Sequence, residues 1–305
     1  MRNAFINQLT EIAKDNKNIE LVTGVLGFGV LKNYYETCPD QFVNAGIAEQ
    51  AMTSVAAGMA LEGKTVFTYS IGNFPTLRCL EQIRNDCAYY NSNVKVVCVG
   101  GGFTYGSLGM SHHATEDIAV MRALPNVTVL CPGDLEEARL AAITAANTDG
   151  TFYIRLGRGG EPRIHEKPID FKIGKAIKVQ DGSRVAIFTT GAIFEEIPKA
   201  IELLKENGIT PAAYTFPTVK PIDKAVIEKC AEEFDVIVTV EEHNVVGGFG
   251  SAVAEVLCES PRRAKLVKIG IEDTYTSEVG SQKHLRKYCK IDSDSIAKRI
   301  LQEVQ

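Results

Sequence analysis

The 305-residue sequence has no apolar run near the roughly 18 residues that a membrane-spanning helix needs. It also lacks an apolar signal region at its N-terminus and any run of basic residues. The formal net charge of -5 argues against non-specific binding to nucleic acid or to an anionic membrane. The eight cysteines include no Cys-x-x-Cys pair and lie mostly in apolar stretches, which is typical of reduced core thiols. These absences predict a cytoplasmic protein whose partners are small molecules or other proteins.

Short β-branched runs alternate with helical patterns along the whole chain, which predicts an α/β fold with two doubly wound domains. The first, at 1–165, is expected to contain a mostly parallel sheet with strands at 19–23, 65–69, 94–99, 127–131 and 152–156, and helices around 3–14, 48–61, 74–90, 115–123 and 134–147. A charged segment at 166–175 is interpreted as a linker. The smaller second domain, at 176–305, is expected to have strands at 185–189, 212–215, 236–240 and 265–269, and helices around 194–207, 222–233, 247–258 and 292–303.

One carboxylate, Glu49, stands in the first turn of a predicted helix whose other residues are mostly small or apolar. Apolar residues recur at helical spacing from about Ala48 to Leu61, so the helix is expected to be mostly buried. Burial favours the protonated form of a carboxylate, whereas the helix N-terminus favours the charged form. Glu49 is therefore either a helix cap or an acid that can share its proton.

Several motifs follow one another in the order seen in the transketolase family. They are Gly46 to Gln50, Asn73–Phe74, Gly109 to His113, Arg122 to Asn126, Pro132 to Asp134 and Tyr153 to Arg158. With them the chain resembles the pyrimidine-binding and C-terminal domains of a thiamine-diphosphate enzyme, and Glu241 to Ser251 resembles a motif of the second of these domains. The family's Gly-Asp-Gly motif, which serves Mg²⁺ and phosphate, does not occur. The resemblance therefore implies the C-terminal subunit of a split transketolase.

The resemblance also implies a thiamine-diphosphate site. Glu49 would hydrogen-bond a pyrimidine nitrogen of the cofactor and favour the imino tautomer that activates it, and Phe74 would pack against the aminopyrimidine. Tyr69 and Ile71 would help to line the same pocket. The Mg²⁺ and the diphosphate would be held mainly by an N-terminal partner subunit that carries Gly-Asp-Gly. Self-association through both domains would then give an assembly of the α₂β₂ kind.

The resemblance implies that three further residues bind the substrate. His112 would hydrogen-bond the donor sugar near the reacting carbon and move or stabilise charge there. His113 has either a structural or a specificity role, and no third ligand accompanies the pair, so no metal site is predicted. Arg158 would bind an anionic substrate, with a surface ion pair as the alternative.

The chain departs from the family pattern at two positions. Gly100 and Leu108 stand where many transketolases have a His and an Asp that hold sugar hydroxyls, and the segment Gly24 to Gly29 shows no counterpart of one phosphate-binding Arg. A site without these partners is expected to favour a modified, less hydroxylated sugar. The run Gly100 to Gly102 lacks the ending of a phosphate loop and is interpreted as a tight turn.

The sequence leaves other assignments open. Glu116 and Asp117 are expected to stabilise the N-terminus of the helix that follows them, and His243 is expected to lie at a subunit contact. The main prediction is ketol transfer from a ketose to an aldose. An enzyme similar to 1-deoxyxylulose-5-phosphate synthase, a subunit that decarboxylates 2-oxo acids, and a non-catalytic partner subunit are the alternatives.

Overall fold

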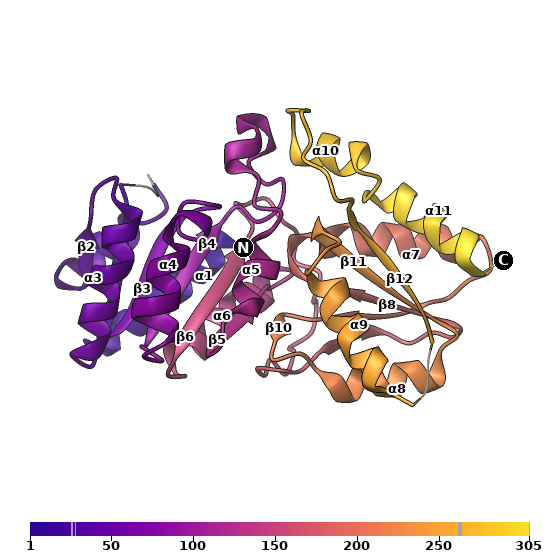
Figure 1. Ribbon diagram of the computed structural model, residues 1–305, viewed down its shortest axis with the longest axis horizontal. Helices are drawn as coiled ribbons and strands as arrows, with labels where there is room; N and C mark the ends of the chain where they lie inside the picture. The colour runs from indigo at the N-terminus through magenta and orange to yellow at the C-terminus, as the bar shows by residue number, and fades with distance from the viewer. Residues whose placement is uncertain (26, 28, 262–263, 305) are drawn as a thin grey trace.

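The computed structural model describes residues 1–25, 27, 29–261 and 264–304, so Leu26 and Phe28 of the Gly24 to Gly29 segment lie outside the described residues. The chain forms two α/β units that lie side by side (Figure 1). Each unit, called a layer below, consists of one sheet with the helices that cover it. The expected fold class is confirmed. Within the described residues, no helix combines the length and the apolar character that crossing a membrane requires.

The first sheet has seven strands in the order β10-β5-β6-β4-β3-β1-β2. All neighbours pair in parallel except β10 with β5. The strands are β1 (Ile19–Thr23), β2 (Phe42–Asn44), β3 (Thr65–Ile71), β4 (Val94–Val99), β5 (Val127–Leu130), β6 (Thr151–Leu156) and β10 (Thr218–Lys220). The strand β10 belongs to the second half of the sequence, so a segment expected in one layer completes the sheet of the other.

Helices cover both faces of this sheet because its strands are apolar on both sides. One face packs against α1 (Arg2–Asp15), α2 (Lys32–Thr37) and α6 (Leu135–Ala146). The other packs against α3 (Glu49–Leu61), α4 (Leu80–Gln82) with its π-helical continuation Ile83–Ala88, and α5 (Asp117–Ala123). The helix expected over 74–90 begins only at Leu80, and a loop with a short 3₁₀ turn, Leu77–Cys79, precedes it.

The second sheet has five strands in the order β12-β11-β8-β9-β7, of which only β7 is antiparallel to its neighbour. They are β7 (Ile177–Gln180), β8 (Val185–Thr189), β9 (Ala212–Thr215), β11 (Val236–Asn244) and β12 (Lys265–Ile271). One face packs against α7 (Ile197–Glu206) and α11 (Ser293–Val304), and the other against α8 (Lys224–Glu233) and α9 (Phe249–Glu259). The short α10 (Gln282–Tyr288) precedes α11. The strand β11 extends past the expected end, Val240, and its last residues reach the first layer.

A buried carboxylate, Glu137 of α6, holds the connection between the two layers. It is hydrogen-bonded to the hydroxyl of Thr215 at 2.5 Å and to Nε2 of His165 at 2.8 Å. Burial alone would lower the pKa of His165, but the hydrogen bond and charge of Glu137 raise it above its ordinary value. The contact joins β9 of the second sheet to a helix of the first.

Candidate active site

The predicted site residues gather where β1, β3 and β4 end. In a parallel sheet these carboxyl ends meet at one edge, where α/β proteins bind their ligands. Loops 72–79 and 100–116 follow β3 and β4, and helix α3 begins beside them with Glu49 as its first residue. A Cβ atom on Gly24, just after β1, would lie 3.6 Å from Cγ of Glu49, so the start of α3 lies against the end of β1.

Glu49 is buried, with 3% of its surface exposed, and it is paired with a cation that the sequence analysis did not find. Nη1 of Arg78 donates to Oε2 of Glu49 at 2.9 Å. The same guanidinium lies over the ring of Phe74, with its central carbon 4.6 Å from the ring centroid. Arg78 thus contacts both residues that were predicted to hold the pyrimidine. The ion pair gives the buried carboxylate a partner that burial alone does not reveal.

His112 also contacts the ring of Phe74. The two rings meet edge to face with centroids 5.1 Å apart, and Nδ1 of His112 is 3.0 Å from the hydroxyl of Ser111. Partial burial, and to a lesser extent the charge of His113, lower the pKa of His112 below its ordinary value. Its imidazole is therefore neutral at pH 7 and able to accept a proton. Glu49, Phe74 and His112, three of the residues predicted from the sequence, are brought together.

Other predicted residues lie deeper. His113 is 4% exposed, its Nε2 is 3.2 Å from the carbonyl oxygen of Gly106, and its ring meets that of Phe103 edge to face. These contacts fit the structural alternative for His113. Tyr69 is 2% exposed and belongs to the cluster beneath α1 and α2, against which Ile71 is partly buried. Tyr69 therefore packs within the apolar core of the first layer.

The departure at Gly100 has a physical cause, because a Cβ atom there would overlap the ring of Tyr105. Tyr105 is buried, its ring centroid is 6.4 Å from that of His112, and the guanidinium carbon of Arg158 lies 5.4 Å from its centre. Within the described residues no carboxylate pairs with Arg158, so the alternative of a surface ion pair is not observed there. Tyr105 connects the two residues predicted to contact substrate, and the sequence analysis did not identify it.

The neighbouring glycines are constrained in the same way. A Cβ atom on Gly101 would lie 2.6 Å from Nε of Arg155, and one on Gly102 would lie 2.6 Å from Cγ of Glu242. The run Gly100 to Gly102 does turn, with positive φ at its first and last residues. The expected tight turn is therefore only part of the explanation. Each glycine also leaves space for the side chain of another residue to pack against its backbone.

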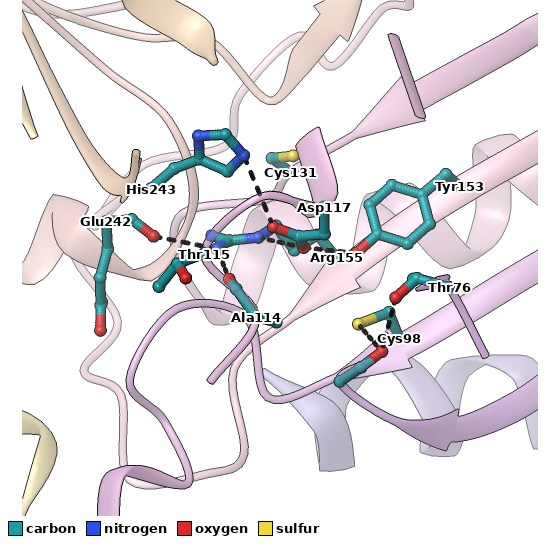
Figure 2. Close-up of polar contacts among 12 residues, drawn as sticks. Thr76, Cys98, Ala114, Thr115, Asp117, Cys131, Tyr153, Arg155, Glu242 and His243 are labelled. Carbon is teal, nitrogen blue, oxygen red and sulfur yellow. Dashed lines mark hydrogen bonds and ion pairs between the residues drawn. The ribbon is translucent and has the colours of Figure 1, made fainter. Parts of the chain in front are cut away.

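A buried network holds the loop that carries His112 (Figure 2). Nε of Arg155 donates to Oδ2 of Asp117 at 2.7 Å, and the hydroxyl of Tyr153 donates to the same oxygen at 2.5 Å. Nη2 of Arg155 donates to the backbone carbonyls of Ala114, at 2.9 Å, and Glu242, at 3.0 Å. Asp117 lies in the first turn of α5, as expected, but it is also fully buried and pairs with Arg155. It neutralises an arginine that joins the loop to β11.

The end of β11 completes this junction. His243 is fully buried and accepts at Nε2 from the backbone N–H of Ala119, while its Nδ1 donates to the carbonyl of Asn244. It lies inside this chain, between the two layers, and the expected subunit contact is wrong. Glu242 accepts from the backbone N–H of Phe103 at 2.8 Å and pairs with Arg286 at 2.7 Å. Both layers therefore position the loop 100–116.

The comparisons with known proteins agree with this architecture. Residues 1–161 match the model described as "Transketolase, pyrimidine binding domain", and residues 174–296 match "Transketolase, C-terminal domain". The chain belongs to the transketolase family. Within the residues that the structure describes, no cluster of three or more His, Cys, Asp or Glu side chains is arranged to hold a metal ion.

Several relatives of this transketolase-family chain are of similar length. It is 40% identical to a "Putative transketolase C-terminal section" of Methanocaldococcus jannaschii over 100% of this chain and 96% of that one. It is 35% identical to one of the subunits of an apulose-4-phosphate transketolase of Phocaeicola vulgatus, over 100% and 97%. A solved structure, "Split gene transketolase, inactive beta4 tetramer", superposes with a TM-score of 0.88 at 33% identity, over 99% of this chain and 96% of that one. The recognition of a C-terminal half of a split transketolase is confirmed.

Proposed function

We propose that this chain is the C-terminal subunit of a thiamine-diphosphate-dependent transketolase that moves a two-carbon ketol unit from a ketose to an aldose. The observation that carries the proposal is the convergence of a buried carboxylate, an aromatic ring and a neutral histidine at Glu49, Phe74 and His112. The family to which the chain belongs supports the cofactor. When bound, thiamine diphosphate supplies an acidic carbon that attacks a ketose carbonyl and retains the transferred unit.

The residues present fit the pyrimidine end of this cofactor. A planar guanidinium already lies against Phe74 while it donates to Glu49, so the two residues accommodate a flat group with a hydrogen-bond donor on its edge. In the proposed role Glu49 hydrogen-bonds the pyrimidine and tunes its basicity, and Phe74 covers its face. His112 accepts or returns a proton at the substrate, for which its lowered pKa suits it at neutral pH.

The diphosphate and Mg²⁺ are proposed to be held by a partner subunit, because Gly-Asp-Gly is absent from this chain. Two apolar side chains beside Glu49 support an assembly at this edge: Ile47 is 84% exposed and Val55 on α3 is 47% exposed. Two copies of each subunit, in an α₂β₂-like arrangement, would bury both.

Titration calorimetry with thiamine diphosphate and Mg²⁺ tests the function. We expect tight binding by a mixture of this chain with a partner subunit that carries Gly-Asp-Gly, and weak or absent binding by this chain alone. Failure of the mixture to bind would favour the non-catalytic alternative. Release of CO₂ from pyruvate by the loaded mixture would instead favour an activity similar to 1-deoxyxylulose-5-phosphate synthase or a 2-oxo-acid decarboxylase.

The substrate is proposed to be a modified sugar with fewer hydroxyls to satisfy than the usual pentose phosphates. The loop beside His112 presents apolar side chains, since Leu108 is 54% exposed and Met110 is 60% exposed, and the ring of Tyr105 excludes any side chain at Gly100. Arg158, on the face of Tyr105, is proposed to bind an anionic group of the substrate.

A panel of ketose and aldose phosphates checks this substrate assignment. We expect kcat/KM to be lower for xylulose and ribose phosphates than for deoxy or branched analogues, because a site without matching polar groups leaves the extra hydroxyls unpaired. Replacing Leu108 with Asp should shift the preference back toward the ordinary sugars. Best turnover on the ordinary pentose phosphates by the unaltered enzyme would contradict the assignment.

A further inference from the structure

Arg78 contacts both Glu49 and Phe74, the two residues proposed to hold the pyrimidine, and neither the comparisons nor the sequence analysis give it a role. It lies in the 3₁₀ turn Leu77–Cys79, and its side chain retains 48% of its exposure, whereas that of Glu49 retains 4%. Arg78 therefore lies on the solvent side of the pair. The carboxylate of Glu49 is thus buried beside a guanidinium that solvent can reach.

The contacts of Arg78 match those expected of the aminopyrimidine. A guanidinium is planar, donates N–H groups along its edge and stacks on aromatic faces. Here one N–H donates to Glu49 at 2.9 Å, and the central carbon lies 4.6 Å from the centre of the Phe74 ring. The same carboxylate and the same ring are the groups proposed to take the pyrimidine, so Arg78 and the cofactor would use the same two groups.

On this basis, and resting on the proposed function, we propose that Arg78 is a placeholder in the pyrimidine pocket. Its guanidinium keeps the buried carboxylate paired while the pocket contains no cofactor, and it moves out toward solvent when the cofactor enters. The placeholder satisfies a charge that would otherwise be buried alone, which is costly. It also makes cofactor binding a competition between two flat donors for one carboxylate.

The contacts of Arg78 are weak enough to be exchanged. Of the five N–H donors of a guanidinium, only Nη1 has a hydrogen-bond partner among the described residues. A half-exposed pair of this kind stabilises a protein only slightly. Arg155 is the opposite case, since it is buried and donates to Asp117, Ala114 and Glu242. Arg78 can therefore leave its partners at little cost, whereas Arg155 cannot.

The first test follows cofactor affinity by calorimetry in the complex with the partner subunit. Arg78→Ala should bind thiamine diphosphate with Mg²⁺ about two- to fivefold more tightly than the unaltered complex, because the competitor is gone. Arg84→Ala is the matched control, since Arg84 is exposed and hydrogen-bonds only its neighbour Asn85. Weaker binding by Arg78→Ala would overturn the placeholder and make Arg78 a supporting cofactor ligand.

The second test observes the guanidinium itself by nuclear magnetic resonance, with ¹⁵N-labelled arginine in the complex. The Arg78 Nε–H signal should move when Glu49 is replaced by Gln, and move in the same direction when cofactor is added to the unaltered complex. If calorimetry shows that the cofactor binds but the Arg78 signal does not move, the inference is overturned. No binding by the unaltered complex would overturn the proposed function, and the inference with it, before any variant is compared.

Discussion

Replacing Glu49 with Gln is expected to reduce kcat of the assembled enzyme by about 10²–10⁴-fold, the range typical of a lost acid or base. Gln keeps the shape of the side chain but is not a carboxylate, so it neither makes the proposed hydrogen bond to the pyrimidine nor forms the ion pair with Arg78. Steady-state turnover measured with cofactor in excess, by the complex of both subunits, checks the expectation. The proposed role of Glu49 depends on its burial, which leaves 3% of its surface exposed.

The loss must come from chemistry and not from unfolding. The pair between Glu49 and the half-exposed Arg78 contributes about 1 kcal/mol or less, so urea unfolding of Glu49→Gln should be nearly unchanged. Glu62→Gln is the control at the other end of α3, where the carboxylate is exposed, and it should retain full turnover. Near-normal turnover of Glu49→Gln would reject the catalytic assignment.

Replacing Asp117 with Asn is expected to lower the free energy of unfolding by about 3–5 kcal/mol, because it leaves Arg155 buried without its counterion. Arg155 and Asp117 retain only 3% and 0% of their side-chain exposure, so water cannot replace the lost charge. Tyr153 also loses a charged acceptor. Burial and the charge of Asp117 raise the pKa of Tyr153 well above its ordinary value, so its hydroxyl remains a donor at any working pH. Urea unfolding of the isolated chain measures the effect.

An exposed ion pair provides the comparison for this variant. Asp294 pairs with Lys199 at 2.8 Å with more than half of each side chain exposed, so Asp294→Asn should leave the free energy of unfolding nearly unchanged. At a temperature where Asp117→Asn is still folded, we expect its KM for the donor sugar to rise, because the loop that carries His112 loses its attachment. Equal stability of the two variants would contradict a structural role for the buried pair.

The positions of Glu49 and Phe74 were predictable because each breaks a local pattern. A carboxylate in an apolar helix and an aromatic ring in a glycine-containing loop both stand out within a few residues of sequence. Arg78, which contacts both of them, was not predictable, because it lies 29 residues beyond Glu49 and has no unusual neighbours in the sequence. The helix expected from 74 begins six residues late, at Leu80, because the segment after β3 is bent by the 3₁₀ turn that places Arg78.

The buried network gave a signal that the sequence analysis did not use. Arg155 lies within an otherwise uncharged strand, and a charge in such a place is rarely buried without a partner. The sequence does not show which of its many carboxylates pairs with Arg155, because Asp117 lies 38 residues away. The backbone carbonyl of Glu242, which also accepts from Arg155, lies in the other layer. The strands β2 and β10 were missed for a simpler reason: each has three residues, too few to establish an alternation.

The sequence by itself determined the alternation of strands and helices, the two-layer architecture and the family, because hydrophobic periods and motif order are properties of neighbouring residues. Only the tertiary structure decided which charges meet. It brought Arg78 to Glu49, Tyr105 onto Gly100 and the end of β11 onto the loop of His112. Electrostatic and packing energies depend on distances through space, and those distances exist only once the sheets have formed and the loops at their carboxyl edges lie together.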